Sequence, residues 1–486
     1  MPNKTNETKQ KKLKVLICAG EAAPFVKTGG LADVCGTLPV ALAAKKIDAR
    51  VMIPLYGQIK DDYRREMKFL GFTYVPLAWR NEYCGVYEIS KDGVVYYFLD
   101  NERYFKRGKI YGEQDAGERF AFFSKAVLEV LSIIKFSPDI IHANDWHTGL
   151  VPVFLDCFYR DFKYTKNTKT VFTIHNIEFQ GQYDRYITGD LLGLDDNQAS
   201  LVTYNKCANY MKGAIESANV VTTVSNTYAE EILNPFFGYG MQDILSARRY
   251  KVKGIINGIS NKDNNPLTDK YLFKNYDINS LELKSLNKIA LQKQFGLEEN
   301  KDIPLIAMVG RLTHQKGIDL VIAGMERIVR TGAQIIVLGS GDANYENNFR
   351  IFESKYHNNV RAYIGFSQDL ASKLYAGSDL FLMPSKFEPC GLSQMIAMRY
   401  GSVPIVRETG GLKDTVIPYN HETKEGVGFT FKTYNAEDMV YAVERAVGLY
   451  KDYKDDWSNV LHNAMSRDFD WSNVADEYIK LYKDLK

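Results

Sequence analysis

Two basic residues stand where one predicted strand ends and a predicted helix begins. In the string Met308-Val-Gly-Arg311-Leu-Thr-His-Gln-Lys316-Gly, both follow an apolar run and precede an amphipathic stretch. Cations at a helix N-terminus are unfavourable against the helix dipole unless an anion joins them. A guanidinium fork beside a lysine point charge suits a leaving nucleoside diphosphate, whose developing charge they would offset. We therefore predict that Arg311 and Lys316 bind phosphate. The alternative is a solvated basic pair.

A carboxylate and a glycine turn follow a second predicted strand, residues 380–383. Here Glu388-Pro-Cys390-Gly391-Leu392 leads into a predicted helix. Glu388 could hold sugar hydroxyls or stabilise an oxocarbenium-like transition state. Cys390 and the N–H groups of Gly391 and Leu392 would lie near a ligand at the helix N-terminus. A first-turn carboxylate that only offsets the helix dipole fits the spacing equally well, so both interpretations stay open.

Two further loops place histidine and aspartate after predicted strands. Asp145 stands within His142-Ala-Asn-Asp-Trp-His147, and His175 closes the apolar run 170–174. A His and Asp cluster can hold a metal, but no fourth ligand is evident. A sugar-positioning role for Asp145, or plain satisfied loop groups, fits as well. A strand-end histidine such as His175 is more often structural, although its ring or carbonyl could face a reacting centre.

A Gly-Gly string occurs twice. Thr28-Gly-Gly-Leu-Ala-Asp33 recurs as Thr409-Gly-Gly-Leu-Lys-Asp414, each time after a strand-like segment. A Gly-Gly turn that opens a helix lets backbone N–H groups approach an oxyanion. In open α/β sheets ligands bind at the carboxyl ends of strands, so two such sites predict a cleft between two domains. The alternative is that each pair is only a tight strand–helix connection.

Short β-branched runs alternate with longer amphipathic stretches, and the same alternation begins again halfway along the chain. That alternation predicts an α/β protein with two doubly wound, Rossmann-like parallel sheets. We place the boundary near residue 252, which gives domains of residues 1–252 and 253–467. The predicted strands are 15–18, 50–53, 94–99, 140–142, 170–174 and 220–224, then 305–309, 334–338, 360–363, 380–383 and 402–406. The predicted helices include 117–134, 204–217, 317–331, 368–377 and 392–400.

Composition excludes several classes of partner. The 486 residues include 61 Lys and Arg against 59 Asp and Glu, so the basic excess of a nucleic-acid binder is missing. Six scattered cysteines fit reduced thiols in a cytoplasmic protein. The Lys-rich residues 1–12 are expected to be disordered, with neither a signal peptide nor a membrane span. We interpret Asp468-Phe-Asp470 as a helix cap and not as a metal site.

Together these strings resemble the bacterial glycogen synthase and plant starch synthase family. The resemblance covers nearly the whole chain, and Lys27-Thr-Gly-Gly-Leu and Phe387-Glu-Pro-Cys-Gly-Leu are highly specific to it. It implies a GT-B fold with an interdomain cleft, whose last helix, 468–486, crosses back onto the first domain. It also implies retaining transfer of glucose from ADP-glucose to the non-reducing end of an α-1,4-glucan such as glycogen. Neither a metal nor another cofactor is implied.

The resemblance further implies a role for each residue that matches a family motif. The phosphate loop and the acidic position after it are Lys27, Gly29, Gly30 and Asp33. The sugar-side residues are Asp145 and His175, the diphosphate pair is Arg311 and Lys316, the catalytic loop holds Glu388 and Cys390, and Asn257 precedes a hinge glycine.

This chain departs from the family pattern at two places. Ser260 and Asn264-Asn-Pro replace the usual Asp and Trp-Asn-Pro after the hinge, which bears on packing there and not on chemistry. Many relatives in the wider superfamily carry a second Glu where this chain has Ile396, so we expect one catalytic carboxylate.

Two rival functions remain. A sucrose or trehalose-phosphate synthase would need an added basic cluster in the first domain, and the Lys27 string argues against it. A glucan-binding protein with a dead donor site would lack Arg311, Lys316 or Glu388, and all three are present. The choice of ADP-glucose over UDP-glucose rests on the resemblance alone.

Overall fold

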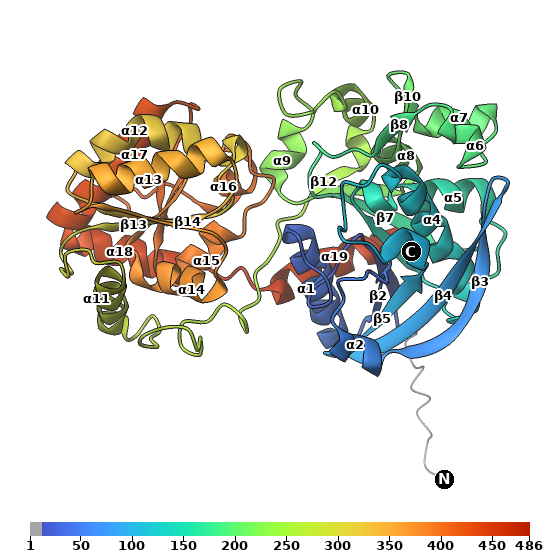
Figure 1. Ribbon diagram of the computed structural model, residues 1–486, viewed down its shortest axis with the longest axis horizontal. Helices are drawn as coiled ribbons and strands as arrows, with labels where there is room; N and C mark the ends of the chain where they lie inside the picture. The colour runs from blue at the N-terminus through green and yellow to red at the C-terminus, as the bar shows by residue number, and fades with distance from the viewer. Residues whose placement is uncertain (1–11) are drawn as a thin grey trace, which may run out of the picture. The chain divides into compact units, whose positions relative to one another are not determined.

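The structure is a computed structural model that describes residues 12–486, and the chain forms two compact units (Figure 1). Unit 1 comprises residues up to 223, then 232–255 and 471–486, and unit 2 comprises 224–231 and 256–470. The expectation of a disordered N-terminal tail falls on residues 1–11, which lie outside the described part. No sequence pattern indicated that residues 224–231 belong to unit 2.

Unit 1 is built on a nine-stranded sheet of order β12-β11-β7-β6-β1-β2-β5-β4-β3. The strands from β12 to β5 are parallel, whereas β4 runs antiparallel to both of its neighbours. In chain order they are β1 (Lys14–Cys18), β2 (Asp48–Pro54), β3 (Lys68–Leu77), β4 (Arg80–Lys91), β5 (Val94–Asp100), β6 (Ile140–Asn144), β7 (Lys169–Ile174), β11 (Val220–Thr223) and β12 (Val252–Gly254).

Among residues 12–486, ten α-helices belong to unit 1. Helix α1 packs against α19, while α4, α5 and α8 form a second group. They are α1 (Gly30–Ala44), α2 (Asp61–Glu66), α3 (Glu102–Phe105), α4 (Ala116–Glu129), α5 (Leu150–Phe158), α6 (Ile187–Asp190), α7 (Asp196–Val202), α8 (Tyr210–Ser217), α10 (Gln242–Ala247) and α19 (Trp471–Leu485). The last of these begins three residues after the predicted start at 468.

The predicted helix 204–217 is wrong in its first half. Residues there form β9 (Thr203–Tyr204) and β10 (Cys207–Asn209), which lie in a three-stranded sheet with β8 (Gln182–Asp184). Asn205 and Lys206 both have positive φ, so they make the two-residue turn that reverses the chain between paired strands. The helix starts only at Tyr210, where the Asn209 side chain caps it.

Unit 2 is built on a six-stranded parallel sheet of order β15-β14-β13-β16-β17-β18. The prediction of two doubly wound α/β parts is therefore confirmed. All five predicted strands of this half agree with the structure to within one residue at each end. The strands are β13 (Leu305–Val309), β14 (Gln334–Gly339), β15 (Val360–Ile364), β16 (Leu380–Met383), β17 (Val403–Arg407) and β18 (Phe429–Phe431).

Helices flank the unit 2 sheet on both faces, with α12, α13 and α17 on one side and α11, α14, α15 and α18 on the other (Figure 1). Apolar side chains of both layers join the strands in one buried core. The helices are α9 (Asn226–Glu231), α11 (Lys284–Gln294), α12 (Ile318–Arg330), α13 (Ala343–Lys355), α14 (Gln368–Gly377), α15 (Ser393–Arg399), α16 (Gly410–Thr415), α17 (Ala436–Asp452) and α18 (Lys454–Met465).

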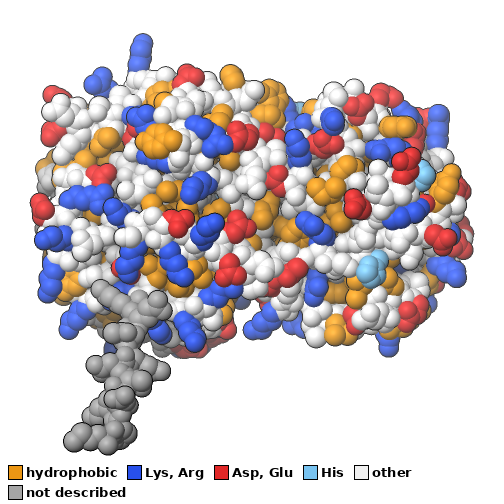
Figure 2. Space-filling view, turned by 180° about the vertical axis from the view of Figure 1, so that it is seen from behind, with side chains coloured by type: hydrophobic (Ala, Val, Ile, Leu, Met, Phe, Trp, Pro, Cys, Tyr) orange, Lys and Arg blue, Asp and Glu red, His pale blue; other side chains and the backbone are white. Residues whose placement is uncertain are grey.

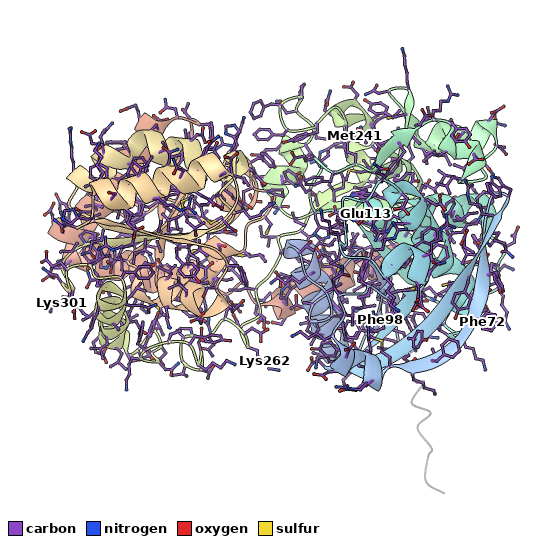
Figure 3. All side chains as sticks on the ribbon, viewed as in Figure 1. Phe72, Phe98, Glu113, Met241, Lys262 and Lys301 are labelled. Carbon is purple, nitrogen blue, oxygen red and sulfur yellow. The ribbon has the colours of Figure 1, made fainter. Side chains whose placement is uncertain are left out.

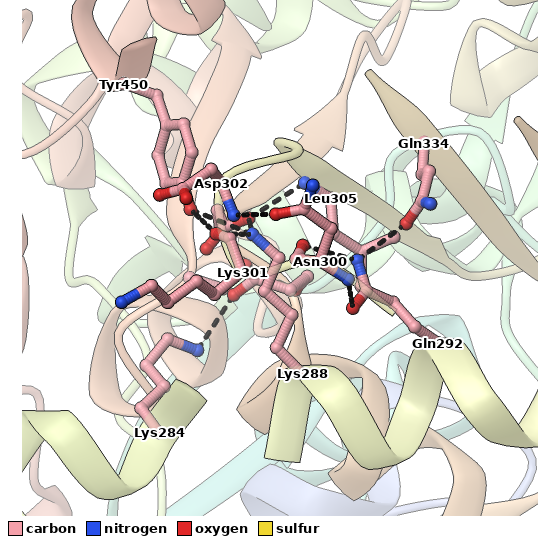
Figure 4. A network of polar contacts seen from close by, with 12 residues as sticks. Lys284, Lys288, Gln292, Asn300, Lys301, Asp302, Leu305, Gln334 and Tyr450 are labelled. Carbon is pink, nitrogen blue, oxygen red and sulfur yellow. Dashed lines mark hydrogen bonds and ion pairs between the residues drawn. The ribbon is translucent and has the colours of Figure 1, made fainter. Parts of the chain in front are cut away.

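A buried polar network ties α11 to the amino ends of two unit 2 strands (Figure 4). The Lys288 ammonium lies 2.6 Å from Asp379 Oδ2 and donates to the Tyr450 hydroxyl at 2.8 Å. Asp379 stands just before β16 and also accepts from the Leu305 N–H, which opens β13. Because the charges are paired and hydrogen-bonded, they can be buried. The network therefore fixes the strands at the end away from their carboxyl-terminal loops.

The outer surface shows no single-sign charged tract on the face drawn in Figure 2. Lys and Arg side chains there are interspersed with Asp and Glu. Among the described residues, no helix combines the length and apolar character needed to cross a membrane.

Candidate active site

The loops after β13, β16 and β17 leave the same edge of the unit 2 sheet, because these neighbouring strands are parallel. Arg311 and Lys316 follow β13, and Glu388 follows β16. The Lys316 ammonium lies 2.6 Å from Glu388 Oε2, and the Ser385 hydroxyl donates to the same oxygen at 3.0 Å. The two residues that the sequence assigned to separate motifs are thus direct partners.

Backbone packing explains why Lys316 reaches Glu388. Gly317 has φ 71° and ends the 3-10 turn His314–Lys316 before α12 begins. A Cβ at Gly317 would lie 2.0 Å from the carbonyl oxygen of Pro384. Only glycine allows the two loops to approach this closely. The glycine therefore places the lysine beside the loop that carries the carboxylate.

Arg311 lies near this pair in the chain but is exposed. Its guanidinium hydrogen-bonds Gln315 at 3.4 Å, and Gln315 in turn donates to the Phe387 carbonyl at 3.4 Å. A guanidinium held by one long bond to a neutral amide keeps most of its donors for an anion.

Arg407, the last residue of β17, supports the loop between β16 and α15. It is 8% exposed, donates to the Ser385 carbonyl at 2.9 Å and also donates to the Lys386 carbonyl. Neither this arginine nor Ser385 was predicted from the sequence. The sequence signal that could have identified Arg407 is an arginine at the end of an apolar, strand-like run.

The second Gly-Gly string does not form an open anion site. A Cβ at Gly410 would lie 2.0 Å from the Glu388 carbonyl, and one at Gly411 would lie 2.1 Å from the Cys390 carbonyl. The Gly410 N–H donates to the Glu231 carboxylate at 3.0 Å, and the Gly411 N–H donates to the Glu388 carbonyl at 3.1 Å. The pair therefore serves close backbone packing, which was the alternative interpretation.

The rest of the loop between β16 and α15 is tightly packed. Cys390 is 5% exposed, and burial raises the pKa of its thiol to about 12, so it is a neutral thiol. Gly391 has φ 76°, and a Cβ there would lie 2.5 Å from Gln394 Oε1; Leu392 directly precedes α15. The side-chain amide oxygen Oδ1 of Asn257 is buried and has no hydrogen-bond partner in the described residues.

In unit 1, Asp145 lies at the carboxyl end of β6 and His175 at that of β7. The His175 N–H donates to Asp145 Oδ1 at 2.8 Å, and the His175 ring contacts Asn144 Oδ1 at 2.9 Å. Burial raises the pKa of Asp145 to about 7, and desolvation lowers that of His175 to about 3. Asp145 has φ 56° and ψ 176°, a conformation that is essentially confined to glycine and costs about 1–3 kcal/mol. Backbone strain of this kind occurs preferentially at functional sites.

The first Gly-Gly string of unit 1 is open, unlike the second. A Cβ at Gly29 or Gly30 would meet nothing within 4 Å, and no side chain caps the helix that starts at Gly30. Lys27 pairs with Asp33 at 2.7 Å, and both side chains are partly exposed. The buried Glu21 carboxylate accepts from the Thr28 N–H at 2.5 Å. Glu21 was missed from the sequence, although it stands three residues after the end of β1, much as Asp145 directly follows β6.

The histidines around Asp145 have structural surroundings. His142 contacts the Tyr482 hydroxyl of α19 at 2.7 Å and the Thr173 hydroxyl at 2.5 Å, so it anchors the last helix to the sheet. Burial lowers the pKa of both His142 and His147 to about 3. Residues 12–486 contain no group of three His, Cys, Asp or Glu side chains arranged to hold a metal ion.

Both halves of the chain match known families. Residues 14–247 match the starch synthase catalytic domain, and residues 291–459 match glycosyl transferases group 1. A glycogen synthase of Anoxybacillus flavithermus is 49% identical over 475 residues, which cover 97% of this chain and 98% of that one. A glycogen synthase of Clostridium beijerinckii is 48% identical over 477 residues, covering 97% of this chain and 99% of the relative.

Solved structures agree. The catalytic domain of starch synthase IV from Arabidopsis thaliana, bound to ADP and acarbose, has a TM-score of 0.89 and 36% identity over 98% of this chain and 99% of that chain. A sucrose-phosphate synthase from Thermosynechococcus elongatus has a TM-score of 0.60 at 19% identity over the same shares, which shows the fold alone.

Two Rossmann-like units with a basic pair and a carboxylate at the strand ends define a glycosyltransferase of the GT-B fold. With relatives this similar over nearly its whole length, the chain belongs to the glycogen synthase and starch synthase family. The family resemblance predicted from the sequence motifs is thereby confirmed.

Proposed function

We propose that this enzyme transfers glucose from ADP-glucose to the non-reducing end of an α-1,4-glucan with retention, releasing ADP. The observation that carries the proposal is the Lys316–Glu388 pair, with exposed Arg311 beside it in the chain. It supplies phosphate-binding charge and a carboxylate in one loop cluster of unit 2. The ADP in the starch synthase IV structure supports an adenine nucleotide as donor.

Arg311 and Lys316 act on the leaving group. As the bond between glucose C1 and the phosphate oxygen breaks, negative charge gathers on the diphosphate, and two fixed cations stabilise it. Before the donor binds, Glu388 satisfies the Lys316 ammonium, so the lysine is already in place. When a donor phosphate replaces Glu388 as the partner of the Lys316 ammonium, Glu388 is free to orient the sugar and to stabilise positive charge on its ring.

Residues at the strand ends of unit 1 have proposed roles of their own. Asp145 and the carbonyl of His175 bind sugar hydroxyls. In unit 2, Asn257 offers its unpartnered amide oxygen as an acceptor. Lys27 and the open N–H groups at Gly29 and Gly30 are proposed to bind phosphate oxygens at the start of α1.

The reaction balances without any cofactor. The acceptor hydroxyl forms the new bond to C1 on the face that the diphosphate leaves, and the leaving phosphate oxygen takes the acceptor proton. The products are a glucan longer by one residue and ADP. Six free cysteines support a reducing compartment, so we propose that the enzyme works in the cytoplasm.

The test is nucleotide release from ADP-glucose and from UDP-glucose, each with and without glycogen. We expect ADP release that requires glycogen and lengthens its chains, with UDP-glucose much the poorer donor. Glucan-independent release, or transfer to a sugar phosphate, would reject the proposal. Faster transfer from UDP-glucose would reject only its donor part.

A further inference from the structure

The turn after β13 holds a histidine between the two residues proposed to bind phosphate. His314 opens the 3-10 turn His314–Lys316, three residues after Arg311, and its side chain is 53% exposed. Lys301, labelled in Figure 3, precedes β13 and marks the amino end of that strand. His314 therefore stands at the opposite, carboxyl end, among the loops of the candidate active site, and no step proposed above uses it.

The imidazole of His314 connects the loop after β13 to the loop after β16. Its Nε2 lies 3.0 Å from the Nζ of Lys386, which stands two residues before Glu388. The backbones of the two loops meet at the same place, because the Lys386 N–H donates to the Gln315 carbonyl at 2.8 Å. The Lys316–Glu388 ion pair joins the same two loops. The contact between His314 and Lys386 is therefore a second side-chain link between them.

The partners of the His314 ring fix its protonation state. A lysine ammonium has only donors, so Nε2 of His314 accepts from Lys386 and carries no proton in this contact. The proton of the neutral ring is then on Nδ1, which lies 3.5 Å from Oδ1 of Asp319. The same Asp319 oxygen accepts from the Tyr434 hydroxyl at 2.6 Å, which holds the carboxylate in place. The contacts therefore require a neutral imidazole with its proton on Nδ1.

The charged and titratable groups around the ring come from every element packed near it. Desolvation and the Asp319 carboxylate raise the pKa of Tyr434 well above its usual range, so its hydroxyl stays a neutral donor. The anion Asp319 faces Nδ1, whereas the cation Lys386 faces Nε2. The full set is Arg311 and Lys316 on the same turn, Asp319 of α12, Tyr345 of α13, Lys386 after β16, Arg407 at the end of β17 and Tyr434 after β18.

A second proton on the His314 ring would break this link. The proton would bind at Nε2, where it removes the acceptor for the Lys386 ammonium and places two cations at hydrogen-bond distance. Histidine is the side chain whose charge changes in the range between pH 5 and pH 8. In acid the loop that carries Glu388 would thus keep its backbone contacts but lose one of its two side-chain links to the turn after β13.

We propose that neutral His314 is a positioning residue for glucosyl transfer: it holds Lys386, and through it the loop that carries Glu388, against the turn that carries Lys316. The inference rests on the proposed function for the reaction that this link serves. Because acid removes the link, His314 adds an acidic limb to the pH profile of kcat. His314 acts through Lys386 and contacts neither the sugar nor the phosphates in this role.

The first test reads the tautomer by nitrogen NMR of the ligand-free full chain, labelled with ¹⁵N at its histidines. The chain has seven histidines, so the signals of His314 are assigned by their loss in His314→Gln. We expect the ring to carry its proton on Nδ1 at pH 8 and to become doubly protonated as the sample is acidified. A ring protonated on Nε2 at pH 8 would overturn the inference.

The second test is the ratio of kcat at pH 8 to kcat at about pH 5.5, measured as ADP release with glycogen and taken within each variant so that unequal basal rates cancel. His314→Gln offers an amide oxygen to Lys386 but cannot gain a proton, so its ratio should be about fivefold smaller than that of the wild type. His314→Lys carries a cation at both pH values, so its ratio should also be small, at a rate below that of His314→Gln at pH 8. His357→Gln, an exposed histidine after α13, is the matched control and should keep the wild-type ratio.

A wild-type pH ratio in His314→Gln would overturn the inference, whatever the tautomer. Burial raises the pKa of Asp145 to about 7, so this carboxyl titrates in the same range, but it does so equally in every variant and leaves the comparison unchanged. The tautomer is read without turnover. A ring protonated on Nδ1 in a protein that transfers no glucose would therefore reject the proposed function and leave the link between His314 and Lys386 standing.

Discussion

The ammonium of Lys316 and the carboxylate of Glu388 lie 2.6 Å apart, although they come from loops after different strands. Glu388 is 6% exposed, so a buried carboxylate depends on this partner and on Ser385. One contact thus joins the lysine proposed to bind phosphate to the carboxylate proposed to bind the sugar. A donor that binds the lysine must also change the surroundings of the glutamate.

Removing either partner should abolish most turnover while leaving the fold intact. Lys316→Ala and Glu388→Gln are each expected to lower kcat for ADP release with glycogen by about 10²–10³-fold, because each removes charge stabilisation made in the transition state. Lys355→Ala, an exposed lysine on α13, is the control. Activity within a few-fold of wild type in either site variant would remove its assigned role.

Gly317→Ala should distort the site through the backbone. Its φ of 71° and the Pro384 carbonyl 2.0 Å from a Cβ predict a loss of at least about 1–3 kcal/mol in the free energy of unfolding. Gly448→Ala in α17 is the matched control, since nothing lies within 4 Å of its Cβ, and it should stabilise by about 0.5–1 kcal/mol. Urea unfolding measures both. Equal effects of the two substitutions would argue against the close loop contact.

Asp145 should make stability depend on pH. Because burial raises its pKa from 3.8 to about 7, the folded state keeps a proton there that the unfolded state releases. Its contribution to the free energy of unfolding is therefore full below pH 3.8 and is lost as pH rises towards about 7. Asp145→Asn keeps an oxygen for the His175 N–H but cannot titrate. The difference in unfolding free energy between wild type and variant should fall across this window, and parallel curves would contradict the assignment.

The buried Lys288–Asp379 pair should matter for stability and not for chemistry. Lys288→Met leaves Asp379 buried without its cation, which is expected to cost about 3–5 kcal/mol. Lys293→Met on the exposed face of the same helix should change little. Thermal unfolding should show a large fall in Tm for the first variant only, with the KM for glycogen unchanged in both below their melting ranges. Similar Tm values would show that the network is not stabilising.

The buried parallel strands were predictable because each is a short, nearly continuous apolar run, as in β13 and β16. The β3–β4 hairpin was missed because one of its faces is exposed and aromatic, so it lacks such a run. The start of α8 was misplaced because the Asn205-Lys206 turn depends on positive φ, which these residue types do not require.

For the site, sequence spacing identified Arg311, Lys316 and Glu388 as chemical groups at strand ends. It could not reveal that Lys316 and Glu388 touch, because that contact depends on how Gly317 meets Pro384. Nor could it separate the two Gly-Gly strings. The space beside Gly29 is open, whereas the Glu388 carbonyl occupies the space beside Gly410. This difference arises from the position of the loop after β16.

The most direct test of the phosphate-binding role proposed for Arg311 and Lys316 is to measure ADP affinity by isothermal titration calorimetry. Wild type, Arg311→Ala, Lys316→Ala and the control Lys355→Ala would be titrated with ADP under one salt condition. We expect each of the first two substitutions to weaken ADP binding by about tenfold or more, as for a lost charge-assisted hydrogen bond, and the control to bind as wild type does. Unchanged ADP affinity in both Arg311→Ala and Lys316→Ala would contradict this role.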